Sequence, residues 1–135
     1  MVARNTDGKL IRRPLSPHLQ VYRWPLSMAL SISHRVTGVG LSIGTLLLTW
    51  WLVAAATSDE AFNHIQWFLG SIIGLILLFF WSVALIFHFC TGIRHLVWDM
   101  VVGFEKPEYT ASGWATIIAT VILTVVVWVV GLATW

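Results

Sequence analysis

Three long stretches without a formal charge constrain this chain more than any other feature of its sequence. They cover residues 36–56, 65–87 and 114–135. A helix of about 20 apolar residues crosses the roughly 30 Å hydrocarbon core of a bilayer, because each residue adds about 1.5 Å. The sequence therefore predicts an all-α membrane protein with three transmembrane helices. We expect the spans at about 27–56, 65–98 and 114–135.

Composition supports a membrane location for the whole chain. Hydrophobic residues make up 58% of its 135 residues and charged residues only 10%, with a mean hydropathy of +0.82. A soluble domain carries about 25% charged residues, so this chain has too few polar side chains to cover a water-exposed surface. We expect one membrane domain, residues 27–135, surrounded by lipid and by other membrane helices, and no nucleic-acid partner. The single cysteine, Cys90, excludes a disulfide within the chain.

Basic residues are distributed unevenly along the chain. Five of the eight Lys and Arg residues lie in residues 1–26, together with three of the four prolines. We expect this segment to be a basic arm at the inner membrane surface, extended or in short helices, and it lacks the apolar core of a removable signal. The loop expected between the first two spans, residues 57–64, has no Lys or Arg. The positive-inside rule therefore predicts that the N-terminus lies on the cytoplasmic or matrix side.

A polar stripe runs along the second predicted span. His88, Gly92, His95 and Asp99 follow one another at i, i+4, i+7 and i+11, so they share one face of a helix. If Asp99 lies near the inner interface, His88 is roughly 16 Å deeper, at 1.5 Å per residue. Ionisable residues at that depth are costly and are interpreted as functional by default.

The residues allow two interpretations of His88. In the first, its neutral imidazole is an axial ligand of haem iron, Gly92 lets the macrocycle approach the helix, and the basic inner end receives the propionates. In the second, His88 makes a hydrogen bond to another helix, while Arg94 and His95 extend toward the interface. Spacing alone does not choose between them.

The haem interpretation also predicts a partner. His18 and His64 lie outside the predicted hydrocarbon region, and no second histidine lies as deep as His88. Three helices are also too few to surround a haem. A six-coordinate haem would then take its second ligand from another polypeptide, in a heteromeric helical bundle.

The start of the first span carries a second candidate site. Ser31 and Arg35 are four residues apart and share a helix face. A hydroxyl and a guanidinium at this level could bind the headgroup oxygens of a quinone whose apolar tail stays in lipid. The alternative is a serine that caps the helix and an arginine that sets topology.

Three motifs stand in a fixed order along the chain. Residues 13–18 read Arg-Pro-Leu-Ser-Pro-His, residues 31–38 follow the pattern S-x-x-H-R-x-T/S-G, and residues 88–99 follow H-x-x-x-G-x-R-H-x-x-x-D. In motif, order and spacing the chain resembles the large cytochrome b membrane-anchor subunits of succinate dehydrogenase (succinate:quinone oxidoreductase, respiratory complex II). The arm motif resembles the mitochondrial and α-proteobacterial branch, so the resemblance implies a bacterial or mitochondrial inner membrane.

The resemblance implies roles for several of the motif residues. The metal site would be His88, as an axial ligand of haem b, with the second axial ligand from a partner subunit. The ubiquinone site would include Ser31, Arg35 and Asp99. The haem propionates would lie near His34, Arg35 and His95, with Arg94 a weaker candidate.

The resemblance also implies partners and a division of labour. They would be a second small membrane-anchor subunit, an iron–sulfur subunit and a flavoprotein subunit. The flavoprotein would oxidise succinate, so this chain would anchor the complex without doing succinate chemistry itself. Two alternatives stay open at this stage: an anchor of a quinol:fumarate reductase, which runs electrons the other way, and a non-redox membrane module.

Overall fold

The computed structural model describes residues 2–12 and 23–134. Its elements in chain order are β1 (Val2–Arg4), β2 (Leu10–Arg12), α1 (Leu26–Thr57), α2 (Asp59–Gly70), α3 (Ile72–Asp99) and α4 (Lys106–Thr134). Three of the helices, α1, α3 and α4, are long and apolar enough to cross a membrane. The prediction of an all-α membrane domain with three spans is confirmed.

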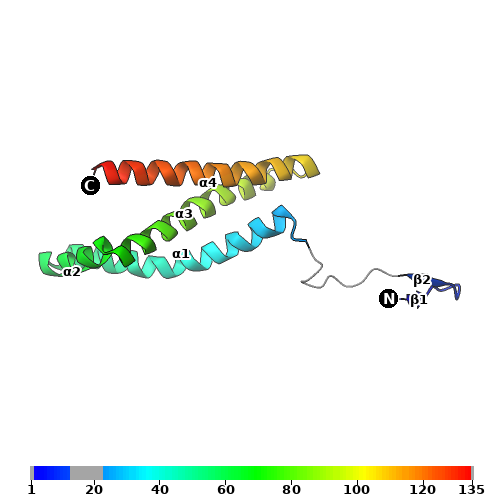
Figure 1. Ribbon diagram of the computed structural model, residues 1–135, viewed down its shortest axis with the longest axis horizontal. Coiled ribbons are helices and arrows are strands. Elements are labelled where there is room, and N and C mark those ends of the chain that lie inside the picture. Colours follow the sequence, from blue (N-terminus) through cyan, green and yellow to red (C-terminus); the bar gives the residue numbers. More distant parts are fainter. Residues whose placement is uncertain (1, 13–22, 135) are drawn as a thin grey trace.

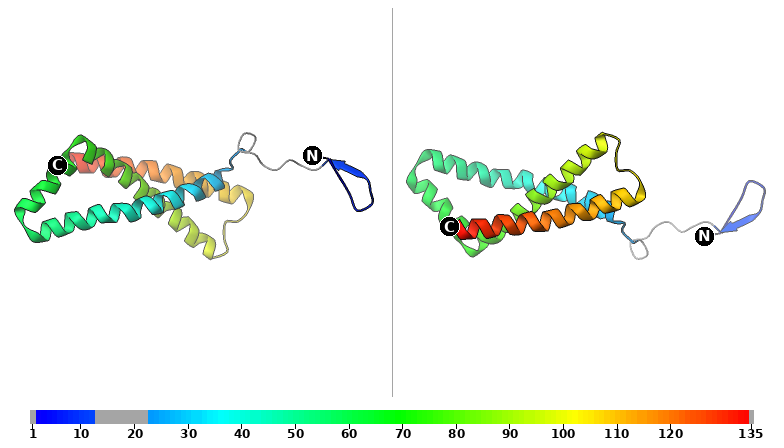
Figure 2. Two further views of the ribbon diagram at one scale, coloured as in Figure 1. Left: turned by 90° about the horizontal axis from the view of Figure 1, so that it is seen from below. Right: turned by 90° about the horizontal axis from the view of Figure 1, so that it is seen from above.

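The three long helices form a bundle with α3 in the middle. α3 runs obliquely between α1 and α4 and opposite in direction to both (Figure 1). Seen from below and from above, α1 and α4 lie on opposite sides of α3 (Figure 2). The start of α1, the end of α3 and the start of α4 therefore meet at one end of the bundle, which we call the entry end. α2 and the C-terminus lie at the other end.

The connection between the first two spans is a helix, not the loop expected for residues 57–64. Ser58 caps α2, because its side-chain oxygen accepts a hydrogen bond from the amide of Ala61 at 3.2 Å. Asp59 and Glu60 occupy the first turn, where negative charge offsets the helix dipole. α2 ends at Gly70, and Ser71 caps α3. The second span accordingly begins at Ile72, seven residues later than the start predicted from the sequence, at about residue 65.

Close packing holds α2 against its neighbours. Ile65 of α2 is completely buried, and α2 contacts both α1 and α3. A Cβ atom at Gly74 would collide with the backbone of Phe68 and Leu69, so the tight turn from α2 into α3 needs a glycine there. Large apolar side chains are otherwise mostly exposed on the helices, as expected for surfaces that face lipid or other membrane helices.

α4 begins earlier than the third predicted span, at Lys106 and not near residue 114. Pro107 lies in the first turn of α4. Proline is tolerated there, because the first amides of a helix have no partner within it. The turn before α4 contains Gly103 at φ 83° and Val101 at φ 60°.

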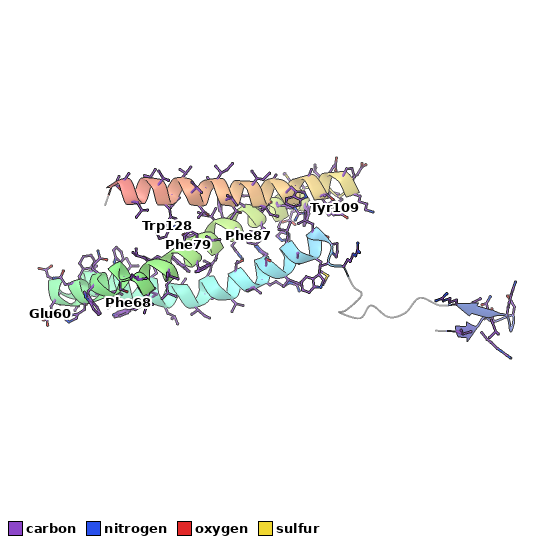
Figure 3. All side chains as sticks on the ribbon, viewed as in Figure 1. Glu60, Phe68, Phe79, Phe87, Tyr109 and Trp128 are labelled. Carbon is purple, nitrogen blue, oxygen red and sulfur yellow. The ribbon has the colours of Figure 1, made fainter. Side chains whose placement is uncertain are left out.

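α4 packs on α3 through small and polar side chains. Thr116, Thr120 and Thr124 repeat every four residues and are each about 6% exposed. Thr116 and Thr120 donate hydrogen bonds to carbonyls one turn back in α4, which satisfies their hydroxyls in an apolar setting. Phe79 and Trp128 meet edge to face between α3 and α4 (Figure 3). Small residues of this kind let membrane helices approach closely.

The basic arm is described in part. β1 and β2 pair as an antiparallel hairpin, with Val2 opposite Arg12. Gly8, at φ 77°, lies in the turn, where a left-handed backbone favours glycine. The motif at residues 13–18, including His18, lies outside the described residues.

Candidate functional site

Three histidines come together near the entry end of the bundle. His34 comes from α1, while His88 and His95 come from α3. The rings of His34 and His88 stack with their centroids 3.8 Å apart and their planes 10° apart. The ring of His95 lies 5.1 Å from that of His34, tilted by 59°. α1 and α3 therefore bring three imidazoles together in one cluster, which we call the histidine cluster.

Thr91 holds His34 in this cluster. Its side chain is almost fully buried, at 2% exposure. The hydroxyl donates to the carbonyls of Phe87 and His88 and also contacts Nδ1 of His34. This threonine therefore ties the His34 ring on α1 to the backbone of α3.

Thr37 and a main-chain carbonyl hold His88. Its Nδ1 lies 3.2 Å from the hydroxyl of Thr37 and 3.2 Å from the carbonyl oxygen of His34. The Thr37 hydroxyl donates to the same carbonyl at 2.9 Å. A Cβ atom at Gly38 would lie 3.1 Å from Cε1 of His88, so the absence of a side chain at Gly38 gives the imidazole its room.

The residues around His88 fit the predicted haem in two respects. Nδ1 of His88 is occupied by oxygen partners, and no hydrogen bond of the described residues uses its Nε2, the nitrogen that a metal would take. One turn further along α3, a Cβ atom added at Gly92 would meet nothing within 4 Å. This open space beside the helix is where a flat macrocycle would need to approach.

The arrangement does not resemble a metal site made by one chain. Among residues 2–12 and 23–134, no group of three or more His, Cys, Asp or Glu side chains is placed to hold a metal ion. A haem differs in its requirement, because its porphyrin supplies four ligands and the protein only the axial ones. The donor set thus fits one axial ligand from this chain and does not fit a free metal ion.

Arg94 does not join the histidine cluster. Arg94 as a whole is 8% exposed, and its guanidinium turns toward α4. Nε donates to the Ser112 hydroxyl at 3.0 Å, and Nη2 donates to the Tyr109 carbonyl at 2.8 Å. The guanidinium carbon also lies 4.1 Å from the ring centroid of Trp98. Arg94, the weaker candidate for a propionate contact, thus fastens the start of α4 to α3.

The predicted quinone residues lie at the entry end, and no hydrogen bond or ion pair of the described residues joins them. Ser31 is half-buried near the start of α1, and Arg35 is exposed one turn further on. Asp99, the last residue of α3, is also exposed. His95, like Arg35, is exposed. These side chains therefore line the outside of the bundle, where a lipid-soluble molecule or a further helix can reach them.

Three residues at the site were not predicted from the sequence: Thr37, Gly38 and Thr91. The signal was present, because each lies three or four residues from a histidine of the cluster on the same helix. A threonine in a membrane helix can satisfy its hydroxyl on the backbone of its own helix or across to another helix. The contacts of Thr37 and Thr91 with histidines of the other helix therefore required the structure.

Comparison with known proteins gives a consistent result. The family profile described as Succinate dehydrogenase/Fumarate reductase transmembrane subunit matches residues 9–127. The succinate dehydrogenase cytochrome b556 subunit of Paracoccus denitrificans is 46% identical over 118 residues, covering 87% of this chain and 91% of that protein. The corresponding subunit of Rickettsia felis is 39% identical, with 87% and 92% covered. The mitochondrial cytochrome b560 subunit of Sus scrofa is 38% identical over 117 residues, with 84% and 68% covered.

Proposed function

The chain belongs to the succinate dehydrogenase/fumarate reductase transmembrane subunit family, and on that premise we propose that it is the cytochrome b anchor subunit of a succinate:ubiquinone oxidoreductase. It would hold the catalytic subunits at the membrane and help to bind haem b and ubiquinone. The similar proteins from Paracoccus, Rickettsia and pig are all named as succinate dehydrogenase subunits. Their names favour succinate oxidation over the fumarate reductase alternative.

The observation that carries the haem assignment is the setting of His88. This half-buried imidazole has its Nδ1 held by two oxygen partners and lies one turn from the open space at Gly92. When bound, haem b supplies a one-electron carrier. The chain's own residues would ligate and orient it, with His88 as the axial ligand and with His34, Arg35 and His95 near the propionates. Arg94 is already bonded to α4 and is the least suited of the candidates.

Ubiquinone would bind at the entry end. The half-buried Ser31 hydroxyl is a neutral hydrogen-bond donor, and Arg35, four residues later, adds a fixed positive charge. A quinone oxygen gains negative charge on reduction, and positioned donors stabilise such a charge strongly in a water-poor site. α3 ends at Asp99, at the same end of the bundle, where its carboxylate would accept and pass on protons.

The geometry of the histidine cluster also supports the proposed partners. His88 is one imidazole, and the outer faces of α1 and α3 are largely apolar and exposed. A second small membrane-anchor subunit would cover this surface and supply the second axial ligand. An iron–sulfur subunit and a flavoprotein subunit would complete the complex, on the cytoplasmic or matrix side of the inner membrane, where the basic arm would lie. This chain would carry no dehydrogenase chemistry of its own.

A paired substitution tests the haem assignment. His88→Ala in the purified complex should remove or change the b-type absorption spectrum. His64→Ala is the control, because His64 lies on α2 at the opposite end, and its one hydrogen bond among the described residues is to the Glu60 carbonyl of its own helix, at 2.8 Å. An unchanged bis-imidazole spectrum in His88→Ala would refute the ligand assignment. A wild-type complex without any Soret band would support the non-redox alternative.

A further inference from the structure

We propose that Thr37 is a positioning residue that, together with the main-chain carbonyl of His34, fixes the tautomer and orientation of His88. In this arrangement Nδ1 carries the proton and Nε2 presents its lone pair for metal ligation. The inference rests on the proposed function, because it concerns the preparation of the proposed haem ligand. It adds a role for a residue of α1 that does not itself touch the iron.

The His34 carbonyl decides which nitrogen of His88 is protonated. Nδ1 of His88 lies 3.2 Å from this oxygen. A carbonyl oxygen can only accept a hydrogen bond, so an unprotonated Nδ1 would place two lone pairs against each other. The neutral imidazole therefore carries its hydrogen on Nδ1. Its other nitrogen, Nε2, is left with the free lone pair that a metal requires.

The Thr37 hydroxyl fits the same assignment. Its single hydrogen points to the His34 carbonyl at 2.9 Å. Its oxygen then offers a lone pair to Nδ1–H of His88 at 3.2 Å. The hydroxyl and the carbonyl thus form a shared acceptor for one imidazole N–H, and the three groups make a closed set of hydrogen bonds between α1 and α3.

The ring is also confined by contact on two sides. The His34 imidazole stacks on one face of the His88 ring at 3.8 Å. Gly38 lies against the ring edge, close enough that an added Cβ would press on Cε1 at 3.1 Å. Because rotation of the ring would break both hydrogen bonds and collide with α1, the imidazole is held in one orientation before any cofactor arrives.

Such a hydrogen bond changes the properties of a ligand as well as its direction. An imidazole that donates its other N–H is a stronger base toward the metal, and loss of such a partner typically lowers metal affinity about 10–100-fold. Without Thr37 the His34 carbonyl still accepts from Nδ1, so we expect the lower end of this range. A stronger base favours ferric over ferrous iron. A tenfold loss of that preference raises a one-electron reduction potential by about 59 mV.

The test compares variants of the assembled complex, purified with its partner subunits. Thr37→Val keeps the shape of the side chain and removes the hydroxyl, whereas Thr37→Ser keeps the hydroxyl. Thr45→Val is the matched control, because Thr45 also lies on α1 and donates to a carbonyl three residues back, that of Ser42 at 2.6 Å. The measurements are the haem reduction potential, the haem content per flavin and the reactivity of the reduced haem with carbon monoxide.

We expect Thr37→Val to raise the potential by about 59 mV, the shift worked out above for a tenfold loss of ferric preference, and to let carbon monoxide bind. Thr37→Ser and Thr45→Val should match the unmodified complex. If Thr37→Val does not assemble, Thr37→Ala against Thr37→Ser makes the same comparison with a smaller side chain. Equal potentials in the hydroxyl-free and serine variants, whether shifted or not, would overturn the role of the hydroxyl.

The outcome also separates this inference from the proposed function. If His88→Ala removes the b-type spectrum while Thr37→Val leaves the potential unchanged, His88 is the ligand and Thr37 does not position it. If His88→Ala leaves the spectrum unchanged, the ligand assignment itself fails, and this inference fails with it.

Discussion

Replacement of Arg94 by methionine should loosen α4 from α3 and leave the haem spectrum intact. The guanidinium makes two hydrogen bonds to the start of α4, to the Ser112 hydroxyl at 3.0 Å and to the Tyr109 carbonyl at 2.8 Å. It also lies over the Trp98 ring at 4.1 Å. Methionine keeps much of the length and apolar character of the side chain and removes all three interactions.

The size of the effect follows from these contacts. Hydrogen bonds between membrane helices contribute about 0.6 kcal/mol each on average, and a desolvated cation–π contact contributes roughly 0.5–2 kcal/mol. The Tyr109 carbonyl keeps a partner after the substitution, because the Ser112 hydroxyl also donates to it at 3.1 Å. No large penalty for an orphaned carbonyl is therefore expected. The opening free energy of the start of α4 should fall by about 2 kcal/mol, which corresponds to roughly 25-fold faster exchange.

Hydrogen–deuterium exchange of the assembled complex measures this opening at residues 106–113. Arg35→Met is the control, because Arg35 is exposed on α1 and should leave exchange in α4 unchanged. A double-mutant cycle with Ser112→Ala should give a coupling of about 0.6 kcal/mol and at most roughly 1.7 kcal/mol. Unchanged exchange at residues 106–113 together with a shifted haem spectrum would mean that Arg94 acts at the cofactor, and the structural argument would be wrong.

Three further predictions concern topology and binding. Reporter fusions at Asp59 and at the C-terminal end should both read as exported, and a cytoplasmic signal at Asp59 would refute the orientation. Gly92→Leu fills the open space beside His88 and should reduce haem content at least tenfold. Gly40→Leu, at an equally open position of α1, should leave haem content unchanged. Equal haem content in the two variants would contradict the proposal that haem approaches α3 at Gly92. Ser31→Ala and Arg35→Ala should each lose about 100–1000-fold in quinone reduction, as for removal of one donor to a developing charge, while an artificial acceptor still reports succinate oxidation. Normal quinone reduction in both variants, in fully assembled complexes, would exclude the site.

The sequence predicted the spans because their signal is local. A run of about 20 apolar residues has few alternatives to a membrane helix, and α1, α3 and α4 each contain one. The extra helix α2 was missed, although its Ser58 cap and two acidic first-turn residues are a recognised start signal. A short polar stretch between two spans was instead taken for a loop, and the break at Ser71 was not expected.

The candidate site was predictable in its location and less so in its contacts. Helical spacing placed His88 and His95 on one face, and the structure brings both to His34. The same spacing could have predicted that Arg94 lies on a different face of α3 from His88. Six residues at about 100° each place Arg94 about 120° from His88 around the helix. Which way the guanidinium would turn depended on Tyr109 and Ser112, which are distant in sequence. Contacts between helices of this kind cannot be found from local periodicity.

The stack between His34 and His88 has a consequence for the folding of the bundle. These residues come from different helices and meet only at one axial alignment of α1 against α3. A slip of a single residue along a helix moves a side chain by about 1.5 Å and turns it by about 100°. Such a slip would separate the two rings and move Thr37 and Gly38 away from His88. Under the proposed assignment, the groups that orient the His88 ring therefore depend on the alignment of the two helices, so a misaligned chain would not present this imidazole for ligation.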